Sequence, residues 1–310
     1  RDVIKEKKPA FVLLENVDRL LKSPSTQRGR DLGIILACLQ EEGYSVEWRV
    51  INAAEYGAVQ RRRRTFIFAY KNETEYAKRI YQKIKYDKKS GDKGISAALK
   101  LMQQEGFFAK GFPVDVIDQN NITTEQLQKD IFEVSENFKF VFENSGYMTD
   151  SVVYTCKTKP VMIKSRVIRD IMQDNVTMPV DEHYYIPKER LYYTDSNVKY
   201  SDETKADLPA ESRKTWQYLK GGKKRLRTSV NGHQYVFSEG PISMLDEWDK
   251  PARTMLTSES SFNRSTHIVK DLVTGRIRLL TPVEAERIQG FPDDWTKECL
   301  VNGNVIEMPE

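Results

Sequence analysis

The fold of the first seventy residues is constrained most by their hydrophobic pattern, in which short apolar runs of strand length surround one amphipathic segment. Residues 10–14 (Ala-Phe-Val-Leu-Leu) form a continuous apolar run of strand length, as expected for a strand buried on both faces. Residues 28–42 predict a helix that ends at Gly43. Its apolar residues fall at spacings of three and four: Leu32, Ile35, Leu36 and Leu39. Residues 44–52 and 65–70 predict two more strands. A strand, a crossover helix and a further strand make a parallel unit, so this region predicts an α/β sheet.

Composition and cysteine usage exclude several classes of protein. The net charge of +4 over 310 residues is mild, so charged partners must be sought through local clusters. The longest apolar runs are too short to cross a bilayer, and no secretory segment opens the chain. The three cysteines, Cys38, Cys156 and Cys299, form no CxxC pair. This argues against a disulfide scaffold or a zinc module, predicts no metal site and favours a cytoplasmic protein.

The tripeptide Glu15-Asn16-Val17 follows the first predicted strand. Ligands of open α/β sheets bind beyond the carboxyl ends of strands, where a carboxylate can act as an acid or as a hydrogen-bonding partner. The alternative is that Glu15 is a solvated residue at the start of a loop.

A basic run, Gln60-Arg61-Arg62-Arg63-Arg64, leads directly into the strand at 65–70. Alternate side chains share a face in extended chain, so Arg62 and Arg64 are expected to point together. Guanidinium groups make forked bonds, which suits a fixed anion or a base edge. The alternatives are a nonspecific basic patch or a salt-bridge network at the end of the sheet.

A third motif runs from Arg278 to Trp295 and begins a well-signalled helix. Thr281 is the expected N-cap, Pro282 takes the first helical position and Glu284 completes a capping box. Gly290 is expected to end the helix. Taken alone, this motif is structural.

Together and in this order, the three motifs resemble those of the DNA (cytosine-5) methyltransferases of bacterial and phage restriction–modification systems. That family carries Glu-Asn-Val, then Gln-x-Arg-x-Arg, then a variable target-recognition region and an Arg-x-Leu-Thr-Pro-x-Glu…Gly-Phe-Pro motif. Residues 250–257 (Lys-Pro-Ala-Arg-Thr-Met-Leu-Thr) also resemble the stretch that closes the recognition region. The direct matches cover about a third of the chain.

The resemblance implies a fold and a reaction. The fold would be a partial Rossmann-like methyltransferase sheet that binds S-adenosylmethionine, with an irregular, mixed recognition domain. The expected segments are the C-terminal part of the catalytic α/β domain at 1–72, a target-recognition region with an insertion at 73–272, and a return segment at 273–310 that carries the capped helix. The reaction would move a methyl group from S-adenosylmethionine to C5 of a cytosine flipped out of double-stranded DNA.

The resemblance also implies roles for single residues. In the family a cysteine thiolate adds to C6 of the base. Glu15 would then act at N3, Arg64 would hold the O2 edge with help from Arg62, and Asn16 would orient the loop. Gln60, Arg61 and Thr257 are further expected DNA contacts.

This sequence departs from the family pattern at two motifs. None of its cysteines follows a proline, so no nucleophile is assigned, and the glycine-rich Phe-x-Gly-x-Gly turn for the cofactor is absent, so no cofactor-binding residue is assigned. The expectation is an incomplete enzyme, inactive alone, that needs a missing N-terminal part or a complementing subunit. Two alternatives stay open: a noncatalytic DNA-binding subunit or degenerate homologue, and an RNA-directed member of the family.

A basic, glycine-containing stretch at 220–228 is the best candidate for contact with the DNA backbone. Its expected DNA-binding residues are Lys223, Lys224, Arg225 and Arg227. Tyr218, His233 and Tyr235 flank the stretch and could stack on or contact bases. The alternative is a solvated basic loop.

Overall fold

The computed structural model describes residues 1–85, 94–118, 121–192 and 210–308, and the chain divides into two compact units. Unit 1 comprises Arg1–Gly57 and Arg62–Lys164, and unit 2 comprises Ala58–Arg61 and Ser165–Glu310. The boundary therefore falls inside the basic run, so that Gln60 belongs to unit 2.

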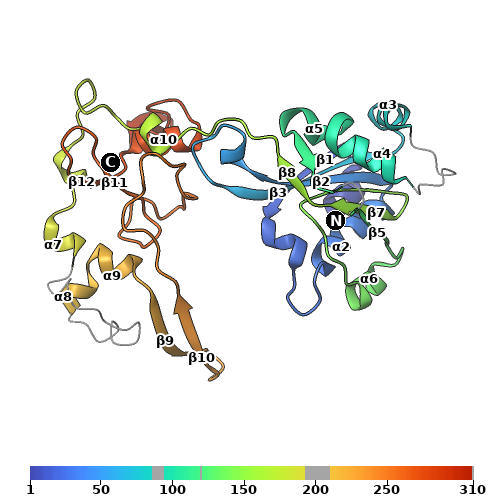
Figure 1. Ribbon diagram of the computed structural model, residues 1–310, viewed down its shortest axis with the longest axis horizontal. Helices are drawn as coiled ribbons and strands as arrows, with labels where there is room; N and C mark the ends of the chain where they lie inside the picture. Colours follow the sequence, from blue (N-terminus) through green and yellow to red (C-terminus); the bar gives the residue numbers. More distant parts are fainter. Residues whose placement is uncertain (86–93, 119–120, 193–209, 309–310) are drawn as a thin grey trace. The chain divides into compact units, whose positions relative to one another are not determined.

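Unit 1 is built on a sheet of six strands (Figure 1). Their order is β1-β3-β2-β6-β7-β5, and each neighbouring pair is antiparallel. The bounds are β1 Phe11–Val17, β2 Tyr44–Asn52, β3 Arg63–Lys71, β5 Thr123–Gln126, β6 Ser145–Thr149 and β7 Val152–Cys156. β1 and β2 run parallel to each other, as predicted, but β3 lies between them. The α/β class is confirmed, whereas the Rossmann-like arrangement is not confirmed by this sheet.

Helices accompany both faces of that sheet, and their bounds follow here. They are α1 Asp2–Lys7, α2 Arg30–Glu41, α3 Glu75–Ile84, α4 Ile95–Lys100, α5 Phe107–Gly111 and α6 Ile131–Asn137. Single turns of 3₁₀-helix lie at η1 Asp18–Lys22 and η2 Ala53–Glu55, and a π-helical turn at η3 Leu101–Glu105. A second pair of strands, β4 Val114–Val116 and β8 Thr158–Pro160, completes the described part of unit 1.

The alternation of side chains along the strands produces two hydrophobic cores. Even-numbered residues of β2, such as Trp48, pack with Leu32 and Leu36 of α2 on one face. Ile51 of β2 and Phe68 of β3 pack with the helices α3 to α5 on the other. Gly146 of β6 lies opposite Trp48, and a Cβ atom on Gly146 would come within 1.9 Å of the indole ring. A glycine at this position is therefore what lets the buried tryptophan lie flat against β6.

Unit 2 consists of short elements connected by long loops. Its bounds are η4 Ile168–Asp170, η5 Glu182–Tyr184, α7 Lys188–Leu191, α8 Ala210–Arg213, α9 Trp216–Lys220, β9 Lys223–Thr228, β10 Gln234–Glu239, β11 Ile268–Lys270, β12 Ile277–Leu279, α10 Pro282–Gln289, β13 Glu298–Val301 and β14 Asn304–Glu307. The described strands of this unit pair as antiparallel hairpins, β9–β10, β11–β12 and β13–β14. Across the described ranges, no helix has the length and apolarity needed to cross a membrane.

The predicted capped helix is confirmed as α10. The hydroxyl of Thr281 accepts a hydrogen bond from the N–H of Glu284, and the Glu284 carboxylate accepts one from the N–H of Thr281. Pro282 occupies the first turn, and Gly290 ends the helix in the left-handed region at φ 84°. α10 buries Ile288 against the core of unit 2.

Candidate functional site

Glu15 and Arg64 form an ion pair on β1 and β3 of unit 1. The Oε1 atom of Glu15 lies 2.6 Å from Nε of Arg64. The pair is diagonal in the sheet, because Val17 is the residue opposite Arg64. The Glu15 side chain keeps 49% of its surface exposed, while Arg64 keeps 21%. The strands thus fix both groups and leave the carboxylate open to a ligand.

Glu15, Asn16 and Val17 lie inside β1, which corrects the expectation that they follow the strand. Apolar residues end at Leu14, but ladder pairing with β3 continues to Val17. The side-chain oxygen of Asn16 accepts a hydrogen bond of 2.8 Å from the N–H of Val17. Asn16 therefore supports the last residues of the strand rather than a loop.

The arginines before and within β3 alternate in exposure. Arg61 and Arg63 are exposed, and Arg62 and Arg64 are half-buried, as expected for extended chain. Nε of Arg63 lies 3.9 Å from Oδ2 of Asp18, a loose and solvated contact. Arg62 and Arg64 are therefore the pair held partly out of solvent.

Gln60 and Arg61 contact the segment 252–255 within unit 2. Gln60 is buried, and its Oε1 atom accepts a hydrogen bond of 3.3 Å from the N–H of Met255. The N–H of Arg61 donates to the carbonyl of Ala252 at 2.8 Å. Thr257, two residues beyond Met255, is exposed in a turn. In this arrangement Gln60 positions the segment that carries Thr257.

The Arg278 guanidinium is fully buried and paired with two carboxylates. Its Nε lies 2.9 Å from Oδ2 of Asp271, and its two terminal nitrogens each lie 2.7 Å from an oxygen of Glu284. Sequence reasoning identified Arg278 and Glu284 but missed Asp271. No local pattern in the sequence identified Asp271, because its role depends on the burial of Arg278 in the fold.

The Asp271 carboxylate also stabilises the start of the β11–β12 turn, where it accepts hydrogen bonds from the N–H groups of Val273 and Thr274. Burial alone would raise its pKa, but hydrogen bonds from Thr274, Val273 and Arg278 outweigh burial and lower the pKa to about 2. Asp271 is therefore ionised near neutral pH, as its ion pair with the buried arginine requires.

The basic stretch forms β9 and part of a hairpin, and its four cations differ in environment. Lys223 is buried, donates to the carbonyl of Leu219 at 2.8 Å and lies 3.7 Å from Glu239. Arg225 hydrogen-bonds the Tyr218 hydroxyl. The other two, Lys224 and Arg227, are exposed. The predicted cluster therefore divides into anchored and accessible side chains.

The aromatic residues predicted to flank this stretch are also divided. Tyr218 lies buried on α9, where Arg225 and Lys223 contact it. His233 and Tyr235 are exposed at the end and along the edge of the hairpin. Only the latter two are open to a ligand.

Two of the three cysteines, Cys38 and Cys156, lie in unit 1, and burial affects the thiols of both. Burial raises the pKa of the Cys156 thiol to about 11, so that thiol is protonated near neutral pH. Burial also raises the pKa of Cys38 on α2. Among the described residues, no group of three or more His, Cys, Asp or Glu side chains is arranged to hold a metal ion.

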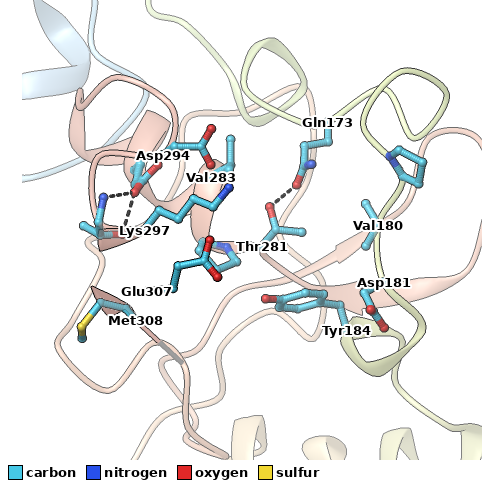
Figure 2. A pocket seen from close by; sticks show the side chains of 14 residues that line it. Gln173, Val180, Asp181, Tyr184, Thr281, Val283, Asp294, Lys297, Glu307 and Met308 are labelled. Carbon is cyan, nitrogen blue, oxygen red and sulfur yellow. Dashed lines mark hydrogen bonds between the residues drawn. The ribbon is translucent and has the colours of Figure 1, made fainter. Parts of the chain in front are cut away.

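A cavity of about 410 Å³ lies beside α10 in unit 2 (Figure 2). Four carboxylates line it, from Asp181, Glu286, Asp294 and Glu307, together with Lys297. Its wall is partly fixed by internal bonds: Oε1 of Glu286 accepts hydrogen bonds from Thr296, and Thr281 hydrogen-bonds Gln173. The residues of the Glu15–Arg64 pair do not line this cavity.

Comparison with known proteins identifies the family. The family model for C-5 cytosine-specific DNA methylases matches residues 1–302. The Type II methyltransferase M.Sau3AI of Staphylococcus aureus is 42% identical over 97% of the chain, which spans 65% of that relative's length. M.NlaIV of Neisseria lactamica and M.NgoBV of Neisseria gonorrhoeae, both Type II methyltransferases, are 41% and 44% identical over 21% of the chain and 16% of their own length. The chain belongs to the C-5 cytosine-specific DNA methylase family.

Proposed function

We propose that this chain carries the base-contacting and DNA-recognition portion of a DNA (cytosine-5) methyltransferase of a Type II restriction–modification system. The reaction is transfer of a methyl group from S-adenosylmethionine to C5 of a cytosine in double-stranded DNA. The observation that carries the proposal is the Glu15–Arg64 ion pair. Two paired strands hold Oε1 of Glu15 2.6 Å from Nε of Arg64 and leave the carboxylate accessible to solvent.

In this proposal the pair contacts a cytosine extruded from the duplex. The target atom is not reachable inside the base stack, so the base has to leave it. Glu15 holds N3 of the ring, and Arg64 holds the O2 oxygen, where negative charge develops when C6 is attacked. Arg62, half-buried on the same side of the extended chain, assists at O2 or at a phosphate.

The residues around the pair do not fit a complete pocket for S-adenosylmethionine. Glu15 lies on β1, the terminal strand of the described sheet, with half of its side chain in solvent. The cavity beside α10 is lined by other residues and carries four carboxylates. We therefore assign no residue of this chain to the cofactor and derive no step through it.

The remaining assignments of the proposal concern segments. Residues 1–72 supply the base contacts, residues 73–272 the recognition region and residues 273–310 a return segment. Unit 2 supports the last assignment through Arg278, whose ion pairs join β12 to the start of α10. Because the chain spans 65% of the Staphylococcus aureus relative, the proposed enzyme includes a further part or subunit that supplies the nucleophile.

The test uses a chimera in which this chain replaces the matching segment of M.Sau3AI. Single-turnover methylation is measured with saturating DNA and cofactor. Glu15→Gln is expected to slow the chemical step by about 10²–10⁴-fold while DNA affinity changes little, because its contact strengthens in the transition state. Arg64→Ala is expected to slow the same step and also to weaken capture of the base.

Two matched variants control for loss of an ordinary surface ion pair. Glu41 is 46% exposed and pairs with Arg1 at 2.5 Å, much as Glu15 pairs with Arg64. Glu41→Gln and Arg63→Ala are expected to keep the parental rate. Equal rates for Glu15→Gln and Glu41→Gln would refute the proposed role of the pair.

A further inference from the structure

The β9–β10 hairpin projects from α9 in unit 2 (Figure 1). Its base is anchored on both strands. Lys223 and Arg264 both contact Glu239, and Arg264 also donates to the carbonyl of Gly240 at 2.7 Å. Beyond this base, both strands are largely exposed, and Gly232 takes the left-handed conformation that closes the turn. The hairpin is thus a two-stranded ribbon held firmly at one end.

The register sorts the side chains onto two different faces. Residues opposite each other in an antiparallel pair share a face. The first face, called the inner face here, carries Lys223, Arg225, Arg227, Tyr235, Phe237 and Glu239. Arg227 stacks on Phe237 at 3.7 Å, and Arg225 bonds Tyr218. On the inner face, Lys223, Arg225 and Glu239 are therefore held by contacts within unit 2, while Arg227 and Tyr235 stay exposed.

The opposite face, called the reading face here, is open. It carries Lys224, Leu226, Thr228, Gln234, Val236 and Ser238. Across the described parts of the chain, the side chains of Lys224, Thr228, Gln234 and Ser238 make no hydrogen bond or ion pair. Leu226 and Val236 lie opposite each other and are 65% and 57% exposed. This face therefore presents an exposed apolar pair, flanked by polar side chains that are free to bind a partner.

We propose that this ribbon enters the major groove of DNA and that its reading face determines the sequence that is methylated. The inference rests on the proposed function, which makes duplex DNA the partner. The major groove admits a two-stranded β-ribbon and displays a distinct donor and acceptor pattern for each base pair. Two cations of the strands, Lys224 and Arg227, are exposed and complement the phosphates, whereas Lys223 is paired with the single carboxylate of Glu239.

The chemistry of the reading face suits base edges. Gln234 can donate to and accept from adenine, and Lys224 can donate to the two major-groove acceptors of guanine. Leu226 and Val236 present methyl groups, which suit the methyl of thymine. Gln234 and Lys224 are therefore specificity-determining residues, while Arg227 at the exposed rim is placed for a phosphate.

The test is selection of bound duplexes from a library with a randomised central segment, using the 310-residue chain. The wild-type chain is expected to enrich one motif. Gln234→Ala and Lys224→Ala are each expected to reduce discrimination at one base position by roughly 5- to 100-fold and to leave the other positions unchanged. Lys270→Ala, an exposed lysine on β11 of the same unit, is the matched control and should keep the wild-type motif.

The outcomes separate the two proposals. Binding with an unchanged motif in both reading-face variants would overturn the ribbon as the reading element and leave the methyltransferase proposal standing. Failure of the wild-type chain to bind any duplex would overturn both. All three variants change exposed side chains, so thermal melts that coincide with wild type would confirm that folding is not the cause.

Discussion

In unit 2 we expect the largest loss of stability from a substitution that removes a partner of the buried Arg278 guanidinium. Glu284 both caps α10 and accepts two hydrogen bonds from the fully buried guanidinium. Glu284→Ala would leave Arg278 with Asp271 as its remaining carboxylate, and removal of one partner from a buried pair costs roughly 3–5 kcal/mol. Thr281→Ala removes the cap and the hydrogen bond to Gln173 but leaves the ion pair in place, and it should cost roughly 0.5–2 kcal/mol. Chemical denaturation of both variants measures the difference, and equal losses would contradict a role for the ion pair.

The candidate site shows how far single residues could be predicted. The types and order of Glu15, Arg62 and Arg64 identified them, because the motif is local in sequence. Burial of Gln60 could not be predicted, since it depends on Met255, 195 positions along the chain. The same holds for Asp271, whose role follows from a turn that only the folded hairpin creates.

Strand β2 carries a buried carboxyl group, that of Glu47, which makes the stability of the fold depend on pH. Burial raises the pKa of Glu47 to about 8, although Arg49 and the N–H groups of Phe107 and Phe108 oppose the shift. Between about pH 4.5 and 8 the folded state holds a proton on Glu47 that the unfolded chain has lost. The contribution of Glu47 to the free energy of unfolding is therefore fully present below about pH 4.5 and is lost as the pH rises through 8. Unfolding free energies between pH 5 and 8 should therefore fall for wild type relative to Glu47→Gln. Exposed Glu136→Gln is the control and should follow wild type, and parallel profiles for all three would contradict this account.

The contact between β2 and β6 depends on the absence of a side chain at Gly146. Gly146→Ala would place a methyl group inside the volume of the buried Trp48 ring. Such overpacking should lower stability by roughly 1–3 kcal/mol. Gly111→Ala, on α5 with open space around its Cα, should change little. Thermal melts of the two variants test this prediction. A melting temperature of Gly146→Ala equal to that of wild type would contradict it, because β6 would then have shifted to accept the methyl group without loss of stability.

The ends of helices and strands could be predicted where neighbouring residues determine them. They could not be predicted where they depend on hydrogen bonds to a strand far along the chain. β2 matches its predicted bounds, and α10 follows its capping signals. The extension of β1 to Val17 was missed, because hydrogen bonding to β3 outlasts the apolar run. The strands β5, β6 and β7 join the sheet from far along the chain, so its antiparallel order could not be derived from periodicity.

We expect the binding of this chain to duplex DNA to depend on salt. Arg227→Ala should flatten the slope of log affinity against log salt by roughly 0.9, the value for one phosphate contact. Lys223→Ala should leave the slope nearly unchanged, because Lys223 is buried and paired with Glu239. Titrations at several salt concentrations measure both, and equal slopes for wild type and Arg227→Ala would exclude this phosphate contact.

The central claim is that the residues of this chain direct methylation to C5 of cytosine. The most direct measurement is nucleoside analysis by mass spectrometry of DNA treated with the M.Sau3AI chimera and labelled S-adenosylmethionine. We expect the label to appear in 5-methyl-deoxycytidine and Glu15→Gln to abolish most of it within the same reaction time. Label in N4-methyl-deoxycytidine or in methylated adenine, or full labelling of 5-methyl-deoxycytidine by Glu15→Gln, would contradict it.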